Sequence, residues 1–153
     1  MICILAIDPG VSGAIAFYWP DFDRIAAMNM PVVNNNVDMA TLAKIIEESK
    51  PTVAIIEQVS AMPKQGVSST FRFGVSYGSV QGVVSALKIP LHFVTPNVWK
   101  KHFRLSAEKE QSRARALQFW PDRSELFKRK RDHGRAEAAL LARYYMEKVI
   151  RPA

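Results

Sequence analysis

The hydrophobic pattern of the chain opens with a short run that ends at an acid. Residues 2–7 are apolar and partly β-branched, which predicts a buried strand, and residues 8–10 (Asp-Pro-Gly) then turn the chain. Two further runs of strand character follow at 12–18 and 24–30. Three consecutive strands of this kind predict an antiparallel meander. The asparagine-rich stretch at 31–37 is expected to be a loop.

The rest of the chain alternates helical and strand patterns. Asp38 is a good N-cap for a helix that ends before Pro51, and residues 52–56 form the most apolar strand pattern in the chain. A strand, a helix and a buried strand in succession predict a parallel pair joined by a right-handed crossover. The other expected elements are a flexible loop at 59–68, a long helix at 69–87, a strand at 91–94, a short helix that carries Trp99, and helices at 108–119 and 134–149. These elements predict one α/β domain over residues 1–153, in which helices flank a five-stranded mixed sheet of order 3-2-1-4-5.

Composition narrows the class of protein. The chain has 153 residues, of which 48% are hydrophobic and 23% charged, as in an ordinary soluble domain. No apolar run approaches the roughly 20 residues that a membrane helix needs, so no membrane partner is expected. The single cysteine, Cys3, cannot form an internal disulfide and fits a reducing cytoplasm.

The positive charge is concentrated in the last third of the chain. Residues 1–97 hold six Lys/Arg and seven Asp/Glu, whereas residues 98–153 hold fifteen and seven, and the whole chain carries a net charge of +7. A one-sided basic surface favours a polyanionic partner, usually nucleic acid. The alternative is a basic surface that only keeps the protein soluble.

Two acids follow the two most buried strands. Asp8 comes directly after residues 4–7, and Glu57 comes directly after residues 53–56. If these strands are the central parallel pair, both carboxylates emerge side by side at the carboxyl edge of the sheet, where ligands gather in open α/β folds. Two anions held so close repel each other, and a bound cation removes this penalty. Carboxylate oxygens favour Mg²⁺ or Mn²⁺ over zinc.

A third acidic group lies at the start of the last expected helix. His133 and Glu137 are four residues apart and share one helix face. Asp132 lies five residues before Glu137, off that face, but it precedes the first turn and could swing inward or act as an N-cap. Taken alone, this stretch also fits a capped amphipathic helix with surface charges.

Together these stretches resemble the RuvC family of Holliday junction resolvases. The acidic motifs that carry the resemblance are Ile7-Asp8-Pro9-Gly10, Ile56-Glu57-Gln58 and Ala136-Glu137-Ala138, the last preceded by Asp132 and His133. The stretch from Thr95 to Lys101 and the one around Ser112 to Ala116 are similar to phage-type members. Each motif alone is weak, but their order, spacing and strand context cover residues 3 to 146.

The resemblance implies an RNase H-like fold and a homodimeric, metal-dependent nuclease that cuts four-way junctions with paired symmetric nicks. In such enzymes one metal ion activates a water and the other stabilises the leaving 3′ oxygen. Asp8 would bridge the two Mg²⁺ ions, for which Mn²⁺ could substitute, and Glu57, Glu137 and either Asp132 or His133 would complete the ligand set.

The sequence departs from the family pattern at two positions. The family usually places an acid three or four residues before the last acid, where this chain has Gly134 and His133, and some relatives have histidine there. Members often carry an aromatic residue three positions after the second acid, where it stacks on junction bases. That position is Ser60 here, and the candidates to replace the aromatic are Met62, Phe71 and Phe73.

Basic residues are candidates for contacts with DNA phosphates. The expected set is Lys64 and Arg72 around the loop after Glu57, Lys100 and Lys101 near Trp99, and the run Lys128, Arg129, Lys130 and Arg131 before the acidic helix. The run also fits a solvated charge cluster.

Three glycines recur every four residues on the long expected helix, at 74, 78 and 82. Glycine lowers helix stability by about 1 kcal/mol relative to alanine, so close packing is expected to compensate. The packing partner is either the sheet or a second copy of the chain.

Other functions remain open at this level. A nuclease of the same fold that acts on flaps, forks or other branches would have the same catalytic centre, and a non-catalytic DNA-binding module would share the charge pattern. The turn at residues 8–13 also resembles the phosphate turn of the actin and sugar-kinase fold, but that fold needs two such domains.

Overall fold

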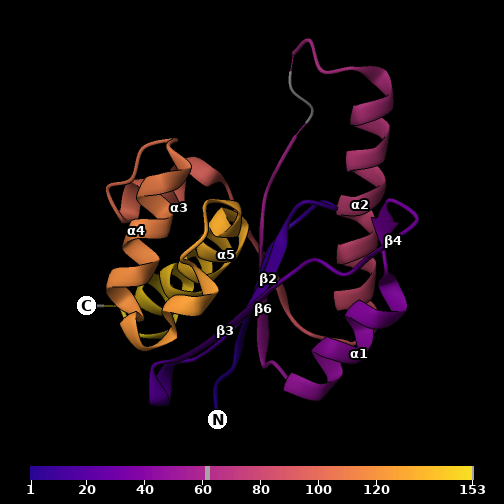
Figure 1. Cartoon of the computed structure of the whole chain (residues 1–153). Coiled ribbons are helices and arrows are strands. Elements are labelled where there is room, and N and C mark those ends of the chain that lie inside the picture. Colours follow the sequence, from indigo (N-terminus) through magenta and orange to yellow (C-terminus); the bar gives the residue numbers. More distant parts are fainter. Residues whose placement is uncertain (61–62, 153) are drawn as a thin grey trace.

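A mixed β-sheet with helices on both faces forms the centre of the molecule in the computed structural model, which describes residues 1–60 and 63–152 (Figure 1). Its strand order is β3-β2-β1-β6-β7. The strands are β1 (Ile4–Asp8), β2 (Ala14–Trp19), β3 (Arg24–Asn29), β6 (Val53–Glu57) and β7 (Leu91–Val94). The first three strands pair antiparallel, and β6 pairs parallel with both β1 and β7. The predicted sheet order 3-2-1-4-5 is therefore confirmed, with β6 and β7 as its fourth and fifth strands.

The asparagine-rich stretch after β3 is not the loop that the sequence suggested. It forms a small separate hairpin of β4 (Val32–Val33) and β5 (Asn36–Val37). Asn34 and Asn35 connect the two strands with φ angles of 50° and 60°. Asparagine tolerates this left-handed conformation, which tight hairpin turns require at both central residues. The prediction of a loop was wrong because this turn chemistry was not recognised.

Two helices cover one face of the sheet. They are α1 (Met39–Ser49) and α2 (Val67–Ala86), on the right in Figure 1, where the first half of α2 projects beyond the sheet. Asp38 caps α1 as predicted, because its side chain accepts a hydrogen bond from the Thr41 backbone N–H at 3.2 Å. Leu42 of α1 and Val80 of α2 are fully buried against the side chains of β1, β2 and β6.

Three helices cover the opposite face: α3 (Pro96–His102), α4 (Lys109–Phe119) and α5 (His133–Tyr145) (Figure 1). Ala136 and Ala139 of α5 are fully buried, and their small side chains let this helix lie close on the sheet. Trp99 and Trp120 are buried core residues of this layer. Short helical turns complete the chain: η1 (Pro20–Phe22), η2 (Pro121–Leu126), η3 (Lys130–Asp132) and η4 (Met146–Ile150). None of the helices in the described residues is long and apolar enough to span a bilayer.

The glycines of α2 do not pack on the sheet. Within residues 1–60 and 63–152, a Cβ atom added to Gly74, Gly78 or Gly82 would meet nothing within 4 Å beyond its chain neighbours and the nearby backbone of its own helix. The inward side of α2 is made instead by Ser76, Val80 and Val84. Packing on the sheet is therefore excluded as the reason for these glycines.

Candidate active site

The parallel pairing of β1 and β6 places two acids next to each other. Ile7 pairs with Ile56, so Asp8 and Glu57 follow at the carboxyl edge of neighbouring central strands. Gly10 holds the turn after Asp8 at a φ of 111°, a conformation that side chains rarely adopt. The register thus brings together two carboxylates that are 49 positions apart in the sequence.

Glu137 joins these acids from helix α5. Burial raises the pKa of Asp8 well above its ordinary value, and the negative charges of Glu57 and Glu137 raise it further. Gly134, one turn before Glu137, lies over Asp8. A Cβ atom added to this glycine would be 3.8 Å from Asp8 Oδ2. Asp8, Glu57 and Glu137 therefore lie within range of one another's charges, and we call these three predicted site residues the acidic cluster.

Two lysines face this cluster. Burial also raises the pKa of Glu57 and that of Glu137, whereas Lys100 acts to lower both. Lys100 Nζ lies 4.0 Å from Glu137 Oε1. Lys109, at the start of α4, opposes the rise in the pKa of Asp8 and of Glu137 without outweighing burial. Sequence reasoning included Lys100 but missed Lys109, since nothing in the spacing relates the start of α4 to the acids.

Glu57 accepts a specific hydrogen bond from a tryptophan. The indole Nε1–H of Trp99 donates to Glu57 Oε2 at 2.7 Å inside the protein. This hydrogen bond favours the charged carboxylate and opposes the rise of the Glu57 pKa that burial causes. Sequence reasoning missed this role of Trp99.

The chemistry of the acidic cluster fits a hard divalent cation. It offers three carboxylates, all with raised pKa values, and positive charge in their midst would relieve their mutual repulsion. Within residues 1–60 and 63–152, no three His, Cys, Asp or Glu side chains already lie together as a ready-made metal site. Glu137 contacts Lys100 through Oε1, so cation binding through that oxygen requires Glu137 to exchange or share its partner, whereas Glu57 accepts from Trp99 through Oε2.

Asp132 is engaged away from the cluster. Its carboxylate is 1% exposed and accepts hydrogen bonds from the Arg129 backbone N–H at 2.9 Å and from the Arg129 guanidinium at 3.1 and 3.2 Å. Burial alone would raise the pKa of Asp132, but these hydrogen bonds and the charges of Arg129 and Arg135 outweigh it and lower the pKa. The side chain does not cap α5, so the role of N-cap considered from the sequence is not taken.

His133 lines a pocket that contains both basic and acidic residues. Within the described part of the chain its buried Nδ1 has no hydrogen-bond partner. Burial lowers the pKa of His133, and the charges of Lys109 and Arg113 lower it further. The pocket, of about 660 Å³, is also lined by Lys109, Lys130 and Arg131 and by two acids, Glu108 and Glu110. A neutral histidine with an unused nitrogen keeps the capacity to bind a cation.

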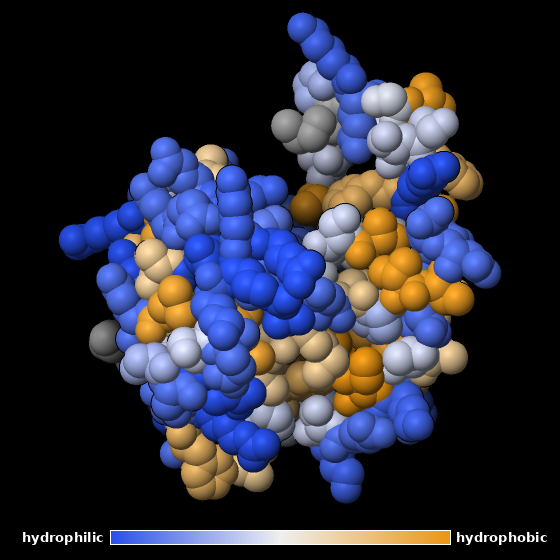
Figure 2. Space-filling view, viewed as in Figure 1, coloured by the Kyte–Doolittle hydropathy of each residue, from blue (hydrophilic) through white to orange (hydrophobic). Residues whose placement is uncertain are grey.

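A second pocket lies beside Glu57, between the start of α2 and the start of α3. It has a volume of about 620 Å³, and Gln58, Ser60, Phe73 and Asn97 are among its lining residues. Figure 2 shows an indentation between the projecting end of α2 and the helices on the left of the view.

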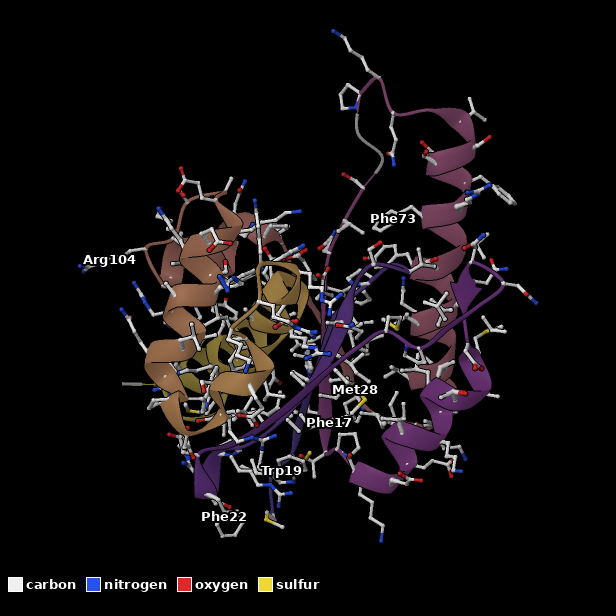
Figure 3. All side chains as sticks on the ribbon, viewed as in Figure 1. Phe17, Trp19, Phe22, Met28, Phe73 and Arg104 are labelled. Carbon is white, nitrogen blue, oxygen red and sulfur yellow. The ribbon has the colours of Figure 1, made fainter. Side chains whose placement is uncertain are left out.

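The three candidates for the missing aromatic differ in position. Phe73 projects from α2 toward the sheet (Figure 3), and its ring would lie 3.2 Å from a Cβ atom at Gly10. Phe71 is instead 73% exposed. Met62 lies outside the described residues. Among the described candidates, only Phe73 lines the pocket that also contains Ser60.

The predicted DNA-binding residues fall on both sides of the acids. Lys64 and Arg72 are exposed at the projecting end of α2, whereas Lys100 and Lys101 lie on α3. The run of residues 128–131 is exposed and leads through η3 into α5. Hydrophilic surface gathers over α4 and α5 in Figure 2, and hydrophobic patches gather on the side of α1, α2 and β4.

Comparison with known proteins gives structural likeness without sequence matches. No protein-family model matches the chain, and no curated protein matches it significantly in sequence. The chain is similar to Thermus thermophilus RuvC in complex with a Holliday junction substrate, with a TM-score of 0.68 and 13% identity over 97% of each chain. For the fowlpox virus Holliday junction resolvase the TM-score is 0.55 and the identity 15%, over 97% of this chain and 99% of that one. For the yeast mitochondrial Holliday junction resolvase the values are 0.58 and 16%, over 94% of this chain and 77% of that one. The chain therefore has the RNase H-like fold of RuvC and other Holliday junction resolvases.

Proposed function

We propose that this protein is a metal-dependent endonuclease that resolves four-way DNA junctions. The observation that carries the proposal is the meeting of Asp8, Glu57 and Glu137 at the carboxyl edge of the central strands, on a fold that resolvases use. Two Mg²⁺ ions held there, or Mn²⁺ in their place, would activate a water and stabilise the leaving 3′ oxygen.

The protein's own residues supply ligands and positioning in this proposal. Asp8 and Glu57 are fixed by the register of two buried strands, and Glu137 is fixed by the close packing of α5. Asp132 is assigned a structural role, because Arg129 already engages both of its oxygens. His133 is the remaining candidate for a fourth ligand. Lys100 and Lys109, which lie near the acids, are suited to hold the phosphate that is cut.

The surroundings of the acids suit branched rather than regular duplex DNA. Exposed cations on α2, α3 and η3 are suited to bind the backbones of DNA arms that diverge from the site. Phe73, rather than Phe71, is assigned the role of the missing aromatic that stacks on bases next to the cut.

We further propose that two copies act together as a dimer through α2. One chain offers one acidic cluster and can make one cut, whereas a four-way junction has near two-fold symmetry and needs two. The exposed face of α2 carries Gly74, Gly78 and Gly82 together with the exposed Phe71 and Val75. A second copy on this face would bury the apolar side chains and make use of the space above the glycines.

Cleavage of four defined substrates tests the proposal. Mobile four-way junctions, forks, flaps and plain duplex would be incubated with the protein in Mg²⁺, in Mn²⁺ and in a chelator. We expect paired, symmetric and religatable nicks on the junction and no cleavage without metal. Equal cutting of flaps and junctions would favour the second candidate, a general branch nuclease. Tight junction binding with no cleavage in either metal would favour a DNA-binding module.

A further inference from the structure

Strand β7, which lies next to Glu57 in the sheet, leads into the helix that carries the hydrogen-bond donor to this acid. Glu57 pairs in register with Val94 of β7, and the Gln58 backbone N–H donates to the Val94 carbonyl at 2.7 Å. Helix α3 begins two residues after Val94, at Pro96, so Trp99 lies within its first turn. The Trp99 indole is fully buried, and its N–H points back to Glu57, the acid that pairs with Val94.

The hydrogen bond between these side chains leaves one carboxylate oxygen available. Trp99 Nε1 donates to Glu57 Oε2 at 2.7 Å, and within the described residues Oε1 accepts no hydrogen bond. A buried indole N–H needs an acceptor, and the one that Trp99 has is an acid of the candidate active site. Core packing by itself would not require that acceptor to be a charged residue of the site.

We propose that Trp99 is a positioning residue, whose N–H fixes the Glu57 carboxylate so that Oε1 is offered to a divalent cation before the cation arrives. This inference rests on the proposed metal-dependent function. A carboxylate held in one orientation loses less side-chain freedom when it binds, so the site gains cation affinity. Groups that orient a metal ligand in this way typically change metal affinity or activity by roughly 10- to 100-fold when they are removed.

The test is the affinity of the DNA-free protein for Mn²⁺, measured by calorimetry. Trp99→Phe keeps an aromatic ring in the core and removes the N–H donor, and we expect it to weaken Mn²⁺ binding by roughly 10-fold. Trp120→Phe is the matched control, because Trp120 is equally buried and its Nε1–H donates to Asp23 at 3.2 Å. The control should lose a comparable hydrogen bond and keep the wild-type affinity for Mn²⁺.

A double-mutant cycle shows whether Trp99 acts through Glu57. In a Glu57→Gln background, Trp99→Phe should cause little further loss of Mn²⁺ affinity, since the carboxylate it orients is gone. A second measurement needs no variant: on titration with Mg²⁺, the indole N–H signal of Trp99 should shift in an NMR spectrum, while that of Trp120 stays in place.

The outcomes separate this inference from the proposed function. Unchanged Mn²⁺ affinity in Trp99→Phe, beside a wild-type protein that binds the metal and cuts junctions, overturns the inference alone. Equal losses in Trp99→Phe and Trp120→Phe, or an unmoved Trp99 signal, also overturn it. A wild-type protein with no affinity for Mn²⁺ or Mg²⁺ overturns both.

Discussion

Gly134 lies directly over Asp8, so that a Cβ atom on the glycine would be 3.8 Å from the Oδ2 atom of the acid. Its other neighbours would be the Ser12 carbonyl oxygen at 3.6 Å and Ala14 Cβ at 3.7 Å, which are ordinary van der Waals distances. The helix position that faces Asp8 is therefore open to a small side chain, and this chain leaves it empty.

A carboxylate placed at this position should strengthen cation binding. We expect Gly134→Asp to raise the Mn²⁺ affinity measured by calorimetry, because it adds a fourth acid beside Asp8. Without metal the same variant should melt at a lower temperature, since the added charge is repelled by Asp8. Gly134→Ala is the control: it fills the space without charge, keeps the wild-type affinity and gains about 0.5 kcal/mol of stability. Equal affinities in the two variants would show that residue 134 does not reach the metal.

Replacing the acids by amides should abolish cutting and stabilise the metal-free protein. Asp8→Asn and Glu57→Gln should lower the cleavage rate by about 100-fold or more, because each removes charge from the site that stabilises the transition state. Junction binding, measured by gel shift, should persist or tighten. Wild-type cleavage by Asp8→Asn would refute the assignment.

The stability effect of Asp8→Asn should depend on pH. The folded-state pKa of Asp8 lies above the unfolded value of about 3.9, so the charged carboxylate destabilises the folded state. That penalty is absent below the unfolded pKa, grows as the pH rises toward the folded pKa, and is complete above it. Asp8→Asn should therefore melt higher than the wild type at neutral pH, and the gain should vanish near pH 3. A constant difference in melting temperature across this range would contradict the raised pKa.

Asp132 and His133 should respond differently to alanine. Asp132→Ala leaves the Arg129 backbone N–H without its acceptor, and we expect a loss of about 1–3 kcal/mol in the free energy of unfolding. Its Mg²⁺ requirement should stay unchanged. His133→Ala should instead raise the Mg²⁺ concentration needed for half-maximal cleavage with little change in stability. The reverse pattern in metal titrations would make Asp132 the ligand and His133 the structural residue.

The exposed basic run should contribute to the salt dependence of DNA binding. Neutralising Lys128, Lys130 and Arg131 together should reduce the slope of log affinity against log salt by about 0.9 for each DNA phosphate that these side chains neutralise. Lys44→Ala, on α1 at the other face of the sheet, is the control and should leave the slope unchanged. A triple variant with the wild-type slope would show that the run points away from DNA.

The dimer proposed for α2 predicts a doubled mass in solution. Light scattering at micromolar concentration should give about twice the chain mass of 17.2 kDa. Gly78→Glu places a charged side chain on the exposed helix face, where its Cβ atom would have no contact within 4 Å from another element of the described chain, so it should yield a folded monomer. That monomer should nick one strand of the junction and lose the symmetric second nick. A wild-type monomer that makes paired cuts would contradict the interface.

The sequence by itself determined the sheet and the place of two acids. Apolar runs of the length typical of buried strands end at Asp8 and at Glu57. The helix predicted between them indicates a crossover connection between parallel strands, which is almost always right-handed. Parallel strands end at the same edge, so the proximity of these two carboxylates followed from local patterns, and the structure has the strand order that these patterns predicted.

Only the tertiary structure decided which other side chains reach those acids. Asp132, His133 and Gly134 are consecutive in sequence, yet the packing angle of α5 turns Gly134 onto Asp8 while Asp132 bonds to Arg129. Trp99 and Lys109 reach the acidic cluster from α3 and α4, whose positions depend on packing against α5 and the sheet. Such contacts join residues far apart in the chain, and no periodicity records them, because periodicity reports which face of one element is buried and not which neighbour it meets.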